Sequence, residues 1–188
     1  MAPEIGKASV ASEESEFEPS PKDHIDYRDQ GGPCLSYLWS HPEKLVGQSL
    51  YLGGEEAPNG KIYCIPGHSE RVLCIDTRTD EVYSIGPLLK GKFKWLRGVV
   101  CGNIIYGLPC HSPTVLRIDT TNDTVSELPI PYPSFYGEEN STLVNQQQKM
   151  KWKYHGGTVS PKDNCIYAIP QSAWHVLRVD PVSDKCTF

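Results

Sequence analysis

One short phrase occurs three times in this chain, and the distances within it are the same each time. The phrase joins an Ile-Tyr-x-[Ile/Leu]-Pro run to a Val-Leu-x-[Ile/Val]-Asp run, and its copies occupy residues 62–76, 105–119 and 166–180. In every copy, Tyr to Pro is three residues, Pro to Val six, Val to Asp four, and Asp to the next β-type position six. Chance does not keep four intervals fixed in three places, so the chain repeats one small unit.

Each copy reads as four short strands joined by turns. A glycine pair (Gly53-Gly54, Gly156-Gly157) or the single Gly98 marks a first strand, the Ile-Tyr run a second and the Val-Leu run a third, and Glu81 to Ile85 and Thr124 to Leu128 are fourth strands. Repeats of about 40 residues written in short β-type runs are typical of propeller blades. The sequence therefore predicts an all-β fold of β-propeller blades, each a four-stranded antiparallel meander, with about three blades at about 46–87, 92–131 and 151–188 of a domain over 34–188.

The Ile-Tyr strand has apolar residues at both alternation positions, as expected for an interior strand that neighbouring blades cover on both faces. The residue after the tyrosine is small in all three copies, namely Cys64, Gly107 and Ala168. A small residue there predicts close approach of an adjacent sheet. The paired aspartates that follow the third strand (Asp76 and Asp80 in the first copy) are expected to close turns.

The second and third copies are separated by an insertion at about 131–150. It contains Tyr132, Phe135 and Tyr136 and then the polar run 145–148, which we interpret as an ordered loop tip followed by a mobile stretch. Loops on a rigid scaffold often bind partners. The three aromatic residues therefore either form a contact patch for a partner or pack on the loop's own blade.

Residues 1–33 hold eight acidic and three basic side chains and almost no large apolar groups, which predicts a disordered acidic tail. Residues 34–188 balance 15 basic with 15 acidic side chains, so we expect neither a nucleic-acid nor a membrane partner.

No run of 18 apolar residues and no signal peptide is present, which makes cytoplasm or nucleus the expected location. Seven cysteines without Cys-x-x-Cys spacing are expected to be reduced thiols.

Four residues at matched repeat positions are further candidates for binding. His68 and His111 each follow the repeat proline by two residues, so both should project from one rim, either as a metal or polar-ligand site or as solvated turn residues. Arg117 and Arg178 share a position in the third strand, where they would face a channel, a partner or a carboxylate of the next blade. No catalytic motif, metal-ligand set or cofactor-binding loop is present, so we predict no catalytic residue, no metal and no cofactor.

Over roughly residues 46–188, the pattern Gly-Gly, Asn-Gly-Lys-Ile-Tyr-x-Ile-Pro and Val-Leu-x-Ile-Asp-Thr-x-Thr resembles the Kelch-like and virginiamycin-B-lyase-like β-propellers. The resemblance implies the propeller fold. The lyases it resembles use a histidine with a metal, but no matching set of residues carries over to this sequence.

Propellers of this class close with at least four blades, and the third copy stops at Phe188 in mid-strand. We therefore expect either an N-terminal part of a longer propeller or a ring assembled by self-association. The predicted function is a non-catalytic interaction module that binds a protein or peptide through its rim loops. The alternatives are a metal-assisted lyase or hydrolase that uses the rim histidines, and an incomplete or purely structural product.

Overall fold

The computed structural model describes Leu45, residues 47–132 and residues 141–188. All of these described residues lie within one compact unit, Ser36–Phe188. The predicted acidic tail, Phe135 and Tyr136 lie outside the described residues.

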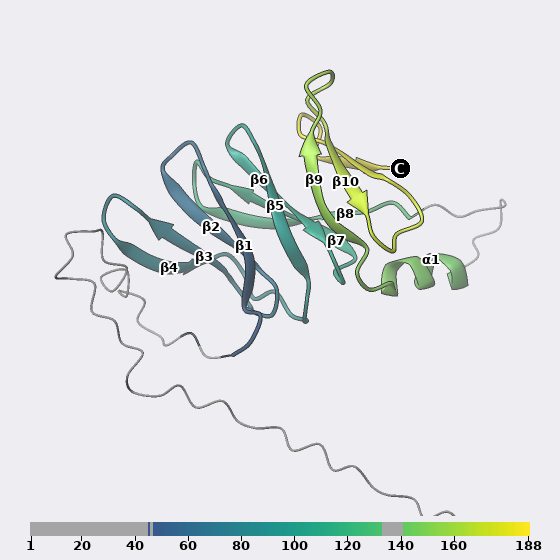
Figure 1. Ribbon diagram of the computed structural model, residues 1–188, viewed down its shortest axis with the longest axis horizontal. Helices are drawn as coiled ribbons and strands as arrows, with labels where there is room; N and C mark the ends of the chain where they lie inside the picture. Colours follow the sequence, from purple (N-terminus) through teal and green to yellow (C-terminus); the bar gives the residue numbers. More distant parts are fainter. Residues whose placement is uncertain (1–44, 46, 133–140) are drawn as a thin grey trace, which may run out of the picture. The chain divides into compact units, whose positions relative to one another are not determined.

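Within the described residues, twelve strands form three antiparallel sheets of four strands, and in each sheet neighbours in sequence are neighbours in space (Figure 1). Blade 1 is β1 (Tyr51–Glu56), β2 (Lys61–Pro66), β3 (Val72–Asp76) and β4 (Glu81–Ile85). Blade 2 is β5 (Trp95–Cys101), β6 (Ile104–Pro109), β7 (Thr114–Asp119) and β8 (Thr124–Pro129). Blade 3 is β9 (Tyr154–Val159), β10 (Ile166–Pro170), β11 (Leu177–Asp180) and β12 (Lys185–Thr187). The predicted four-stranded meanders are confirmed.

Local turn chemistry explains why the strands end where they do. Gly60 and Gly102 adopt left-handed φ angles of 78° and 59° in the hairpins that lead into β2 and β6. The first aspartate of each pair closes the next turn as expected, because the carboxylates of Asp76, Asp119 and Asp180 accept the amide N–H two residues ahead, at 3.0, 3.1 and 2.9 Å.

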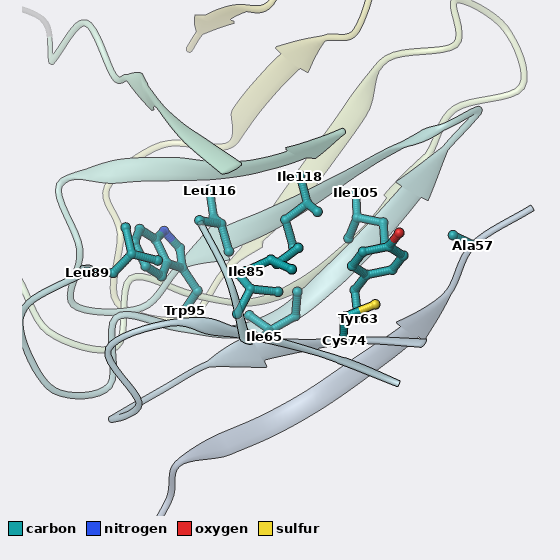
Figure 2. Close-up of a cluster of buried hydrophobic side chains, with 11 residues drawn as sticks. Ala57, Tyr63, Ile65, Cys74, Ile85, Leu89, Trp95, Ile105, Leu116 and Ile118 are labelled. Carbon is teal, nitrogen blue, oxygen red and sulfur yellow. The ribbon is translucent and has the colours of Figure 1, made fainter. Parts of the chain in front are cut away.

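Two apolar cores lie between the blades, and blade 2 contributes to both. The first joins Tyr63, Ile65, Val72 and Cys74 of blade 1 to blade 2 residues that include Ile105, Leu116 and Ile118 (Figure 2). The second joins Tyr106, Leu108 and Val115 of blade 2 to blade 3 residues that include Ile166, Ala168, Leu177 and Val179. Both faces of β6 are therefore buried, as the sequence predicts for an interior strand.

The inserted segment differs from the prediction of a loop with a mobile end. Residues Ser141–Lys149 form the helix α1, and Gln147 within it is only 3% exposed. Glutamine has a straight side chain that loses little rotamer freedom in a helix, so a polar run such as 145–148 is compatible with helix. Its weak apolar periodicity gave no sign of one. In the part of the chain that the structure describes, no helix is long and apolar enough to span a membrane.

Candidate functional site

The candidate site lies where β2, β6 and β10 end, beside the residues that precede β1, β5 and β9. A series of backbone hydrogen bonds runs across the three blades at this edge. The N–H groups of Gly67, Lys94, Cys110, Lys153 and Gln171 donate in turn to the carbonyls of Leu50, Gly67, Lys94, Cys110 and Lys153, at 2.9 to 3.2 Å. These bonds fix the loops of successive blades relative to one another, which makes the edge a preformed platform.

Four aromatic rings from the three blades pack together on this edge. The Phe93 ring contacts His68 edge-to-face at 4.3 Å between centroids, His111 at 5.4 Å and Trp152 at 5.1 Å. His111 and Trp152 also meet edge-to-face at 5.0 Å. Phe93 and Trp152 occupy the same place before β5 and β9, and both have left-handed φ angles, of 49° and 56°. We call His68, Phe93, His111 and Trp152 the four-ring cluster.

Both candidate histidines, His68 and His111, are half-buried in the structure. The Nε2 atoms of His68 and His111 are buried, and neither has a hydrogen-bond partner among the described residues. Burial lowers the pKa of His111, and the nearby charges of Lys151 and Lys153 and the His68 imidazole lower it further. At neutral pH the His111 ring is therefore uncharged and retains one nitrogen able to exchange a hydrogen bond with a ligand.

Two lysines that follow Phe93 and Trp152 in the sequence, Lys94 and Lys153, are buried. The Lys94 ammonium donates to the carbonyls of Ser69, Gly67 and Gly91 at 2.7, 3.0 and 3.2 Å, and Lys153 donates to the carbonyl of Met150 at 3.0 Å. Burial lowers the pKa of each to about 8. Both ammonium groups are thus mainly charged at neutral pH, and carbonyl dipoles stabilise them.

Sequence analysis missed these lysines, although a signal for them was present. The box Lys90-Gly-Lys92-Phe93-Lys94-Trp95 recurs before blade 3 as Lys149-Met-Lys151-Trp152-Lys153-Tyr154. In both copies the third lysine is buried and the first two are exposed. A domain with balanced total charge therefore has a local excess of lysine around the four-ring cluster.

A cavity of about 180 Å³ opens beside this cluster on blade 2. Its lining includes Lys90, Lys92, Lys94, His111, Ser112 and Glu127. Three lysines against one carboxylate favour a ligand with negative charge.

The other predicted site residues lie elsewhere. Arg117 forms an ion pair with Asp184 of blade 3, with 3.0 Å between Nε and Oδ2. A contact with a carboxylate of the next blade was one of the expectations for this residue. Arg178 lies 3.6 Å from Asp163 of its own blade. Tyr132 is half-buried, with its ring 5.8 Å from that of Phe188. The structure thus brings His68 and His111 together but joins neither to Arg117, Arg178 or Tyr132.

A complete metal site is not evident in this region. Among residues 45, 47–132 and 141–188, no three or more His, Cys, Asp or Glu side chains gather closely enough to hold an ion. The two imidazoles alone would supply only part of a coordination shell.

Comparison with known proteins identifies the fold class. No family model and no curated protein matches the chain. Among solved structures, virginiamycin B lyase from Staphylococcus aureus is 18% identical with a TM-score of 0.55, and the match covers 77% of this chain and 42% of the lyase. A streptogramin B lyase gives 15% identity and a TM-score of 0.54, with 76% and 41% of the two chains covered. At such identities the likeness concerns the fold alone.

The protein therefore belongs to the β-propeller class, and its chain spans less than half the length of the propellers it resembles. Its three sheets are propeller blades of the kind found in virginiamycin B lyase. The Kelch-like part of the resemblance finds no support in these comparisons.

Proposed function

We propose that this β-propeller module binds an acidic segment of a protein or peptide partner on the four-ring cluster and the lysines around it. The observation that carries the proposal is the pair of buried His68 and His111 Nε2 atoms, which lack partners among the described residues. Buried polar groups are normally hydrogen-bonded, so a ligand that displaces the groups covering these two atoms would supply the partners they lack.

The surrounding charges favour an acidic ligand. Lys90, Lys92, Lys149 and Lys151 are exposed on the segments that carry Phe93 and Trp152. Carboxylates of a bound segment would meet these ammonium groups while apolar side chains contact the Trp152 ring, which is 40% exposed. Electrostatic attraction of this kind raises association rates and selects partners by charge.

A nucleic acid fits this surface less well. Proteins bind single-stranded nucleic acids by stacking the bases on exposed faces of aromatic rings. Here the rings already pack against each other, His68 with Phe93 and His111 with Trp152 edge-to-face, so part of their face area is covered.

The test measures binding of labelled peptides of equal length in which the number of glutamates increases around one leucine. Affinity should increase with glutamate number, and the charge reversals Lys92→Glu and Lys151→Glu should each weaken binding about tenfold, in keeping with the energy of interfacial charge pairs. Lys162→Glu is the matched control, because Lys162 is exposed in the hairpin between β9 and β10, at the other end of the sheet.

Two results would contradict the proposal. One is an affinity that does not depend on glutamate number, or that the control lowers as much as the other two variants. The other is a single-stranded oligonucleotide that binds more tightly than the most acidic peptide.

A metal-assisted lyase or hydrolase is the second candidate, and the same two imidazole nitrogens favour it. Neutral imidazole is a common ligand of zinc and related metals. In a closed ring, additional blades would have to supply the remaining ligands. Elemental analysis of the purified chain tests this candidate: a bound metal that is lost in the His68→Ala/His111→Ala variant would support it, and a bound metal that the variant retains would contradict it.

A further inference from the structure

Two pairs of neighbouring blades are joined by side chains at the same two positions of the repeat, a tyrosine and a turn aspartate. The hydroxyl of Tyr63 in blade 1 donates to Asp123 Oδ1 of blade 2 at 2.5 Å, and that of Tyr106 in blade 2 donates to Asp184 Oδ1 of blade 3 at 2.8 Å. Both aspartates lie in the turn before the fourth strand and have left-handed φ angles, of 56° and 52°. Blade 2 thus presents a tyrosine donor to blade 3 and a turn aspartate to blade 1.

A cation accompanies the tyrosine in both contacts. Lys61 Nζ lies 2.7 Å from Asp123 Oδ2, and Arg117 Nε lies 3.0 Å from Asp184 Oδ2. In each contact the aspartate accepts one hydrogen bond from a tyrosine hydroxyl and one charge-assisted bond from a cation. Together they make the aspartate a specific acceptor.

Blade 3 carries the donor half of this contact on the face that points away from blade 2. Ile166 and Ala168 are fully buried in the core with blade 2, so Tyr167, between them on the strand, faces the other way. Arg178 lies opposite Tyr167 in the register of β10 and β11, just as Arg117 lies opposite Tyr106. In this structure Tyr167 donates to Asp163 of its own blade at 2.9 Å.

The same face also exposes apolar side chains whose counterparts are buried in the other blades. Ile169 is 58% exposed, whereas the equivalent Ile65 and Leu108 are 0% and 1% exposed. Val176 is 49% exposed, whereas the equivalent Val72 and Val115 are fully buried. This face therefore has the composition of a contact between blades.

Blade 1 carries the acceptor half. Asp80 occupies the turn position of Asp123 and Asp184 and has the same left-handed backbone, with a φ of 57°. Ile62 and Cys64 of β2 are only half-buried, whereas the equivalent Ile105, Gly107, Ile166 and Ala168 of the other blades are buried.

We propose that the outer face of blade 3, formed by Tyr167, Ile169, Val176 and Arg178, docks against blade 1 of a second copy of this chain. Tyr167 and Arg178 then exchange Asp163 for Asp80 of the second copy, repeating the contact seen twice within the chain. Such a head-to-tail contact joins two different surfaces, so it either closes a ring of copies or extends as a chain of them. The inference concerns assembly and does not depend on the proposed ligand of the four-ring cluster.

The test is the molar mass of the full chain in solution, measured by sedimentation velocity over a wide range of concentrations. We expect assemblies larger than one chain, and association weakened roughly tenfold or more by Arg178→Glu or Ile169→Asp, as for loss of a central interface contact. Val182→Asp is the matched control: Val182 is 92% exposed but lies in the turn between β11 and β12, outside the proposed face.

Charge complementation makes the test specific to the Arg178–Asp80 pair. Arg178→Glu and Asp80→Lys chains should each associate weakly alone and should associate with each other when mixed, with circular dichroism used to check that both fold. A chain that is monomeric at all concentrations would overturn the proposal. So would assemblies that form equally well with Arg178→Glu and Ile169→Asp.

Discussion

Both contacts between neighbouring blades contain a turn aspartate at the same position of the repeat. The cation that binds this aspartate differs between the contact of blades 1 and 2 and the contact of blades 2 and 3. Asp123 is bonded by Lys61, from the start of β2, and by the hydroxyls of Tyr63 and Tyr83. Asp184 is bonded by Arg117, from the middle of β7, and by Tyr106. Cys74 stands in blade 1 at the position of Arg117, directly across from Tyr63. Where the third strand lacks an arginine, the second strand supplies a lysine.

This difference shows which parts of the contact the repeat must keep. The tyrosine and the turn aspartate recur because their positions are set by strand register and turn geometry. The cation needs only to reach the carboxylate, so different strands can provide it. The side chain of Asp123 is also less exposed than that of Asp184, at 25% against 38%.

The largest expected effect comes from removing the more enclosed acceptor. Asp123→Ala removes the carboxylate to which both the Lys61 ammonium and the Tyr63 hydroxyl donate, and we expect the free energy of unfolding to fall by about 3 kcal/mol. Asp184→Ala removes fewer bonds at a more exposed site and should lower it by about 1.5 kcal/mol. Urea unfolding of both variants measures the difference. Equal losses would show that the two contacts are energetically equivalent despite their geometry.

A glycine substitution compares a strand that packs against another blade with a strand face that no other described blade covers. A Cβ at Gly157 would lie 2.6 Å from Leu108 Cδ1 of blade 2 and 2.7 Å from the Tyr167 carbonyl oxygen. We expect Gly157→Ala to destabilise the protein by about 2 kcal/mol, as overpacking does.

The matched control is Gly54→Ala in blade 1. A Cβ there would meet nothing closer than 3.4 Å, and the substitution should change stability by less than about 0.5 kcal/mol. Thermal unfolding followed by circular dichroism distinguishes the two variants. A similar loss in both would mean that the glycine serves its own strand and not the approach of the next blade.

The smallest expected effect is a dependence on pH of the stability that the Asp123 contact between blades 1 and 2 contributes. Burial alone would raise the pKa of Asp123, but hydrogen bonds from Lys61, Tyr63 and Tyr83 outweigh burial and hold the pKa below its usual value. A lowered folded-state pKa gives stability that is present above the unfolded value of about 4 and is lost as pH falls through the folded pKa.

The stability difference between the wild type and Asp123→Asn should therefore be constant near neutral pH and decrease below about pH 4, by less than about 1 kcal/mol for a partly exposed pair. Urea midpoints at a series of pH values measure it. A difference that grows as the pH is lowered would contradict the assignment.

The sequence determined the blade pattern because strands and turns depend on residues close together in the chain. The fixed intervals of the repeat placed all three second strands, and β4 begins and ends at Glu81 and Ile85 as expected. The small residues after the tyrosines also indicated close packing, and Ala168 is fully buried. Helix α1 was missed because its polar run has no clear apolar face.

The tertiary structure decided how these residues are used. The two aspartates of each pair look alike in sequence, yet Asp119 closes its own turn while Asp123 accepts a hydrogen bond from the blade before it. The two lysine boxes are visible in the sequence, but the burial of Lys94 and Lys153 and the packing of His68, Phe93, His111 and Trp152 are not. Such contacts join residues of different blades, and their partners follow from how the sheets pack on one another, which local sequence does not specify.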